Sequence, residues 1–293
     1  MNRKDFIKIL GIVPLTTTMN NLSTLRSLDQ SLPLSEKMPV LFLGHGSPMN
    51  AIEENEFVSS FRKLGKEVAK PKVILCVSAH WETRGTKVTA MQNPSTIHDF
   101  GGFPQALFDV QYPAPGSPEL AQETKDMITK TEVELDHHWG LDHGAWSVIK
   151  HMYPDADVPV IQLSLDYTKD PQYHYELAQQ LERLRHKGVL IVGSGNVVHN
   201  LRRVAWQKLN DTYAWDWAQE ANDKMRNFIL DGNHDALIQY HKQGSSFAMS
   251  IPTPEHYLPL LYTLALKDKK EEVELFNDKT VGGSISMMSL RIA

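Results

Sequence analysis

The sequence predicts a single α/β domain in which helices cover both faces of a central, mostly parallel or mixed sheet. Short, continuous apolar runs end at glycine or at small polar residues, as buried strands do. Stretches with helical spacing of their apolar residues stand between these runs. The 293 residues suffice for one large domain, and strands that alternate with helices form sheets of this kind.

The predicted elements alternate from residue 38 to the C-terminus. The first strand covers residues 40–43, the first helix covers 55–67, and the second strand covers 72–78. The later strands cover residues 158–164, 188–193 and 283–290, and the later helices lie near residues 118–130, 171–186 and 214–230. No internal repeat or linker interrupts this series, so we assign residues 38–293 to one domain.

Residues 1–37 are predicted to be a leader outside this domain. Arg3, Lys4 and Lys8 flank a short apolar stretch, which resembles a twin-arginine signal peptide with lysine in place of the second arginine. A disordered N-terminal appendage is the alternative. No segment is long and apolar enough to cross a membrane. We therefore expect a cytoplasmic protein or, if the leader directs export, a periplasmic one.

Composition excludes several classes of function. The formal net charge of -5, with acidic and basic residues interspersed, argues against a nucleic-acid partner. The single cysteine, Cys76, lies in an apolar run, which predicts a buried thiol and excludes both internal disulfides and zinc sites built from cysteines. The chain also lacks a nucleophile elbow, a Walker loop and a dinucleotide-binding fingerprint. We expect a monomer or a small homo-oligomer.

Three of the 13 histidines follow predicted strands. His45 stands between two glycines after the first strand, His80 follows the second, and His199 follows the strand at residues 188–193. Ligands of open α/β sheets bind beyond the carboxyl ends of the strands, so these histidines are expected to meet at one sheet edge. Each alone is also compatible with a turn or a packed structural histidine.

A fourth histidine, His256, follows a stretch with two prolines. We predict that Thr253 caps a helix that begins at Pro254, which places His256 in its first turn. The positive end of a helix disfavours a protonated imidazole, and a neutral imidazole is the form that binds metal.

Two further segments are candidates for the chemistry of the site. Asp142 is predicted to cap a helix that begins with His143, where this imidazole can act as an acid or base. His98, Phe100 and Phe103 lie in a loop rich in glycine and aromatic residues. This loop is expected to bind a flat aromatic substrate, and its alternative role is a satellite hydrophobic cluster.

Seven ordered stretches resemble the 4,5-DOPA extradiol dioxygenase family, which belongs to the class III, LigB-type ring-cleaving dioxygenases. The likeness runs from about residue 39 to the C-terminus. The stretches are FLGHGSPMN (42–50), VSAHW (77–81), IHDFGGFP (97–104), YPAPG (112–116), LDHGAW (141–146), GNVVHN (195–200) and PTPEHYLPL (252–260).

The resemblance implies one divalent metal surrounded by His45, His80, His199 and His256. Bacterial members are described with zinc, whereas ring cleavage in this class is expected to need Fe(II). The wider class holds iron with two histidines and a glutamate, and His256 stands where that glutamate is expected. His199 is then either a fourth ligand or, with His143, a catalytic acid/base.

The implied reaction opens a DOPA-like catechol with dioxygen to give a muconic semialdehyde. Two other functions stay open on the sequence alone: a zinc hydrolase that acts on a small amide or ester, and a non-catalytic metal-binding interaction protein. Oxygen consumption distinguishes the dioxygenase from the hydrolase.

Overall fold

A computed structural model describes residues 36–209 and 211–293 and contains a six-stranded central sheet with the order β6-β2-β8-β1-β12-β9. Four strands run parallel to their neighbours: β1 (Val40–Gly44), β2 (Val73–Ser78), β6 (Val160–Gln162) and β8 (Val189–Gly195). At one edge, β12 (Ser289–Ile292) pairs antiparallel with both β1 and β9 (Val273–Phe276). The sheet is therefore mixed, and the predicted fold class is confirmed.

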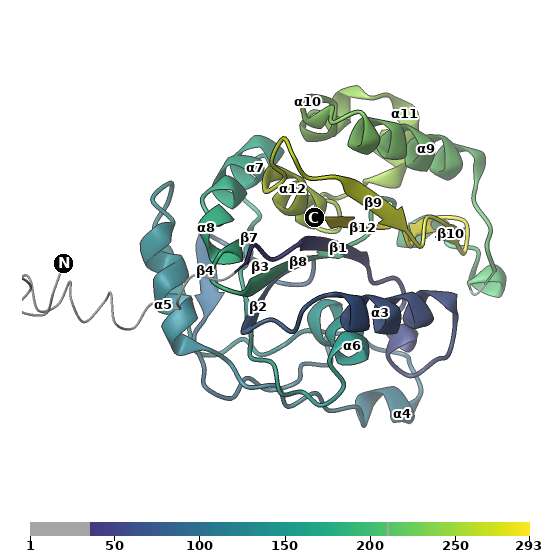
Figure 1. Ribbon diagram of the computed structural model, residues 1–293. Helices are drawn as coiled ribbons and strands as arrows, with labels where there is room; N and C mark the ends of the chain where they lie inside the picture. The colour runs from purple at the N-terminus through teal and green to yellow at the C-terminus, as the bar shows by residue number, and fades with distance from the viewer. Residues whose placement is uncertain (1–35, 210) are drawn as a thin grey trace, which may run out of the picture. The chain divides into compact units, whose positions relative to one another are not determined.

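Helices cover both faces of this sheet (Figure 1). On one face, α3 (Glu56–Glu67) packs against α6 (His143–Met152), and both contribute to the main apolar core. On the other face, α12 (Leu258–Ala265) contacts β1 and β8, and α7 (Pro171–Gln179) packs on α12. Covering both faces explains why every residue of β1, β2 and β8 is buried.

The remaining helices and three small two-stranded sheets surround the central sheet. The helices are α4 (Gln105–Phe108), α5 (Pro118–Met127), α8 (Glu182–Arg185), α9 (Asp216–Leu230), α10 (His234–Ile238), α11 (Ser245–Ser250), η1 (Pro48–Ala51), η2 (Leu201–Arg203), η3 (Trp206–Lys208) and η4 (Tyr240–Lys242). The short strands pair as β3 (Glu82–Thr83) with β7 (Leu165–Asp166), β4 (Thr86–Thr89) with β5 (Val133–Asp136), and β10 (Thr280–Val281) with β11 (Ile285–Ser286).

Three sequence predictions need correction. The last strand is divided, because residues 285–286 pair with β10 whereas residues 289–292 join the central sheet. The helix expected over residues 171–186 is two helices, α7 and α8. No helix begins at Pro254: Tyr257 and Leu258 donate their backbone N–H groups to the Pro254 carbonyl in a turn, and α12 starts only at Leu258.

The predicted leader lies outside the described residues except at its last two positions. Within the part of the chain that the structure describes, none of the helices has the length and hydropathy needed to span a bilayer. Cys76 is fully buried in β2, as predicted.

Candidate metal centre and active site

His45 leaves the carboxyl end of β1 and is almost fully buried. The turn that carries it is tight, since a Cβ on Gly44 would lie 2.6 Å from backbone atoms of Met287. Nδ1 of His45 lies 3.0 Å from Oγ of Ser194, and this hydroxyl donates its hydrogen to the Gly144 carbonyl at 2.5 Å. The hydroxyl can then only accept from His45, so the imidazole proton sits on Nδ1 and Nε2 keeps a free lone pair.

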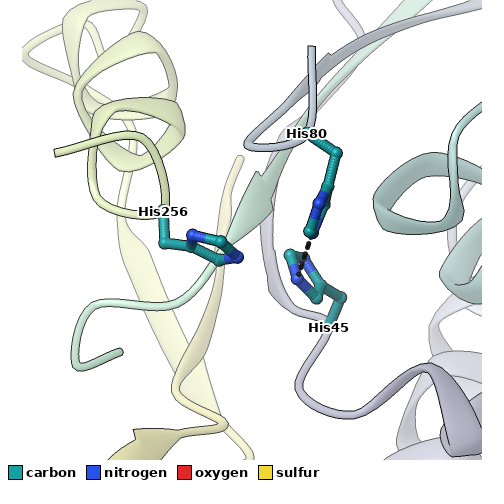
Figure 2. A group of neighbouring side chains, drawn as sticks. All are labelled: His45, His80 and His256. Atoms are coloured by element: carbon teal, nitrogen blue, oxygen red, sulfur yellow. Dashed lines mark hydrogen bonds between the residues drawn. The ribbon is translucent and has the colours of Figure 1, made fainter. Parts of the chain in front are cut away.

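His80 follows β2 and faces His45. Its Nδ1 lies 3.3 Å from Oδ2 of Asp99, and a carboxylate accepts hydrogen bonds only. The negative charge of Asp99 at this distance favours the tautomer of His80 with its proton on Nδ1. Its Nε2 lies 3.2 Å from Nε2 of His45, the contact drawn as a dashed line in Figure 2. Two ring nitrogens that each carry a lone pair thus point at one another.

Neither ring takes up a second proton at neutral pH that could lie between these two nitrogens. Burial, and then the neighbouring His80, lowers the pKa of His45 well below its usual range. Burial, followed by the nearby His143, lowers the pKa of His80 to about 3. Both imidazoles are therefore neutral at neutral pH, and this is the form in which two histidines can share a cation.

His256 approaches from the other side, out of the turn before α12 (Figure 2). A Cβ on Gly195 would lie 2.2 Å from the His256 carbonyl oxygen, so only glycine at the end of β8 admits this turn. Nδ1 of His256 lies 3.0 Å from Oε1 of Glu255, which leaves Nε2 free. One ligand atom each of His45, His80 and His256 lies within 4.8 Å of the others. Burial and the surrounding histidines hold the pKa of His256 well below its usual value.

His199 stacks on His256, with ring centroids 3.5 Å apart and an angle of 10° between the rings. Its backbone N–H donates to the Ser250 carbonyl, which anchors the segment after β8. Burial, with a smaller contribution from His143, lowers the pKa of His199 to about 4.

His143 is the first residue of α6, and Asp142 caps that helix, as predicted. Asp99 joins this helix end to the histidine cluster. Its Oδ1 accepts from the His143 backbone N–H at 2.9 Å, and its Oδ2 lies 2.9 Å from Nδ1 of His143, at ion-pair distance. Burial raises the pKa of Asp99, but His143 and His80 outweigh this effect and the net shift is downward. Asp99 is thus ionised beside two imidazoles.

A cavity of about 630 Å³ opens in front of the histidines. The five histidines, Asp99, Phe100 and Phe103 all line it. His98 does not line it: its Nε2 lies 2.9 Å from the Val110 carbonyl oxygen, and the ring packs beside Phe100. The loop therefore brings two of its three predicted substrate-binding residues to the cavity.

The sequence alone does not predict two parts of the cavity. Asp99 adjoins His98, and an acid next to a histidine is too common to single out. Leu201, Trp206 and Leu209 lie in an irregular segment without helical or strand periodicity, so no pattern marked them. Trp206 and Leu201 remain 61% and 52% exposed although they line the cavity.

Comparisons with known proteins identify the family of this chain. The family model described as "Catalytic LigB subunit of aromatic ring-opening dioxygenase" matches residues 39–288. The chain is 49% identical over 264 residues to a 4,5-DOPA dioxygenase extradiol of Escherichia coli, an alignment that covers 88% of this chain and 96% of that protein. It is 36% identical over 256 residues to the protein of the same name from Beta vulgaris, covering 85% and 94% of the two chains.

This chain is also similar to a solved structure. The crystal structure of an uncharacterised protein from Escherichia coli K12 has a TM-score of 0.77 and 42% sequence identity to this chain. The match covers 88% of this chain and all of the other. The chain therefore belongs to the LigB family of aromatic ring-opening dioxygenases, and it is an oxidoreductase of the extradiol type.

Proposed function

We propose that His45, His80 and His256 hold one divalent metal at which a catechol is opened by dioxygen. The Nε2 atoms of His45 and His80, which face each other 3.2 Å apart, are the observation that carries this proposal. Bonds of about 2.0–2.1 Å in tetrahedral geometry place two ligand nitrogens about 3.3 Å apart, so this separation suits a shared ion. The third group, His256, is neutral and has its Nε2 free.

The stacking of His199 supports a role other than metal ligand. His256 would hold the metal through the lone pair of its Nε2. The ring of His199 lies nearly parallel to the ring of His256, with the centroids 3.5 Å apart. The ring nitrogens of His199 therefore do not point where those of His256 point, and His199 would not be a further ligand. We assign His199 to contact with the substrate and to proton transfer.

The metal that suits the reaction is Fe(II). A bound iron ion supplies an electron path between the catecholate and dioxygen, whereas zinc supplies Lewis acidity alone. His45, His80 and His256 would hold this metal as neutral ligands. Zinc is expected to occupy the same residues without supporting turnover.

His143 is assigned as an acid/base. Asp99 occupies its Nδ1 side, so Nε2 is the ring nitrogen available to the cavity. We expect Nε2 to take a proton from a catechol hydroxyl and to return it during ring opening. The imidazolium formed in between is stabilised by the ionised Asp99. Phe100 and Phe103 are expected to flank the ring of the substrate.

The substrate is proposed to be a DOPA-like catechol and the product a muconic semialdehyde. The relatives from Escherichia coli and Beta vulgaris carry the name 4,5-DOPA dioxygenase extradiol, which supports this choice. The aromatic residues of the cavity lining also favour it. The serine in that lining, Ser47, caps η1, and its Oγ accepts from the Met49 backbone N–H.

Oxygen uptake tests the proposal. Protein loaded anaerobically with Fe(II) is expected to consume dioxygen when DOPA is added, and a yellow semialdehyde is expected to form. The zinc form should bind DOPA without consuming oxygen. If the iron form consumes no oxygen with any of a panel of catechols while the zinc form hydrolyses an ester or amide, the site belongs to a hydrolase instead.

A further inference from the structure

A second cavity, of about 660 Å³, adjoins the far end of α6 from the histidine cluster. His143 begins this helix, whereas Lys150, His151 and Met152 at its other end line the second cavity. Ten residues of helix span about 15 Å, so the two cavities are separate sites.

The lining of this second cavity is rich in positive charge. It contains Arg62, Lys66 and Lys150 against a single carboxylate, Glu54. Glu54 is already bound to both terminal nitrogens of Arg62, at 2.5 Å each. Among the described residues, neither Lys66 nor Lys150 has a carboxylate within ion-pair distance. The excess of two cations stands out in a chain with a net charge of -5.

Of these two lysines, Lys150 is the stronger evidence for a ligand site, because its side chain is half-buried. Burial is the largest cause of the lowered pKa of this amine. A basic residue in the last turn of a helix often caps that helix, but Lys150 does not. Its Nζ donates to the carbonyl of Ala51 in η1, and His151 bonds the Asn50 carbonyl beside it. The ammonium group is therefore held over the cavity by a neutral acceptor, without a counter-charge.

The rest of the wall is largely apolar. Besides Gln111 and His151, it consists of Ala51, Ile52, Tyr112, Pro113, Met152, Pro154 and Ala156. The hydroxyl of Tyr112 is already used, because it donates to the Tyr153 carbonyl at 2.8 Å. A ligand that fits this lining has a small apolar body and two negative groups.

We propose that this cavity binds a small organic dicarboxylate, whose two charges are paired by Lys66 and Lys150. The site does not depend on the reaction proposed above. It is linked to the histidine cluster by one residue, since Asn50 accepts from His151 through its carbonyl and donates from Nδ2 to the His45 carbonyl at 2.9 Å.

Calorimetric titration of the full-length, metal-loaded protein with glutarate tests this site. Saturable binding of one glutarate per chain is expected, and inorganic phosphate should bind at least about tenfold more weakly, because it has no apolar body. Lys66→Met and Lys150→Met should each lower the affinity for glutarate by about tenfold or more. The control is Lys63→Met, one turn earlier on α3, where the lysine is exposed and paired with Glu67 at 3.6 Å; its affinity should equal that of the wild type.

Several results would overturn the proposal. These are the absence of saturable binding, equal affinity for phosphate, and wild-type affinity in the Lys66→Met protein. The last of these is also the result expected if glutarate binds at the histidine cluster. If Lys150→Met fails to fold after losing its bond to Ala51, the Lys66→Met titration decides the question alone.

Discussion

Asp99 connects the groups that the site needs in fixed positions. One carboxylate oxygen lies 3.3 Å from Nδ1 of His80 and 2.9 Å from Nδ1 of His143. The other oxygen accepts the backbone N–H at the start of α6. A single side chain thus contacts a proposed metal ligand, a proposed acid/base and the first backbone N–H of a helix, and its charge favours a proton on Nδ1 of His80.

Asp99→Asn should therefore loosen the metal. An amide retains the shape of the carboxylate but not its charge, and it no longer favours a proton on Nδ1 of His80. We expect the affinity for metal to fall by about 10–100-fold, as is typical when the partner of a metal-binding histidine is lost. Competition with a chelator measures this.

The matched control is Asp109→Asn, because this exposed carboxylate lies in the same loop region and contacts only Gln105 among the described side chains. It should retain the metal as the wild type does. Equal metal retention in both variants would contradict the role given to Asp99.

The segment from η2 to η3 forms one wall of the cavity. It is tied to the β10–β11 turn, because Ala205 donates to the Gly282 carbonyl and Gly282 donates to the Lys208 carbonyl. Its Trp206 lines the cavity and is still 61% exposed. An exposed indole at the mouth of a cavity is expected to be covered when an aromatic ligand enters.

Trp206→Ala is expected to raise the KM for a catechol by roughly tenfold, the equivalent of about 1.4 kcal/mol of lost apolar contact. The kcat and the metal content should change little, because the indole touches none of the proposed ligands in the described structure. Steady-state kinetics with the iron form gives both constants. Tyr167→Ala removes an aromatic residue that is 53% exposed and lies away from the cavity, so its KM should stay at the wild-type value. An unchanged KM in Trp206→Ala would remove this segment from the binding site.

The elements that carry the histidines differ in how well the sequence predicts them. The sequence predicts His45 and His80 at the sheet edge because each follows a continuous apolar run, which is typical of a buried parallel strand. Glycine beside His45 marks the point where its strand ends. At His256 the local Thr-Pro pattern predicts a helix start, whereas the structure has a turn there. What decides that turn is a contact with Gly195, which is distant in sequence.

The same distinction explains the C-terminal strands. Residues 283–290 are apolar enough to predict a strand, but pairing divides them between two sheets. Pairing partners of β12 come from both ends of the chain, so local periodicity cannot identify them. Asp99 belongs to the same class of features, since its importance arises only when His80 and His143 are brought to it.

On the scale of the whole molecule, one buried histidine far from the cavity makes stability depend on pH. His174 on α7 is fully buried, and its Nδ1 lies 3.0 Å from the hydroxyl of Tyr262 on α12. Burial lowers its pKa from 6.5 to about 4. Above pH 6.5 the ring is neutral in the folded and unfolded chains alike. As the pH falls towards 4, the unfolded chain takes up the proton first, and the folded state loses stability.

This shift corresponds to about 3 kcal/mol of the free energy of unfolding, lost progressively between pH 6.5 and pH 4. In His174→Gln the decline over that range should be smaller by about this amount, whatever the stability of the variant at pH 7. Urea denaturation at a series of pH values measures the decline. His137→Gln, at an exposed position, should follow the wild type. Parallel curves for wild type and His174→Gln would contradict the effect of burial.

Turnover of DOPA under isotopically labelled dioxygen tests whether the histidine cluster directs both atoms of dioxygen into an opened ring. The aldehyde is trapped at once, and the mass of the product is measured by mass spectrometry. The iron-loaded protein is expected to give a ring-opened product that carries both labelled atoms, and His45→Ala is expected to give none. A product without label, or with the ring intact and the label lost to water or peroxide, would contradict this expectation.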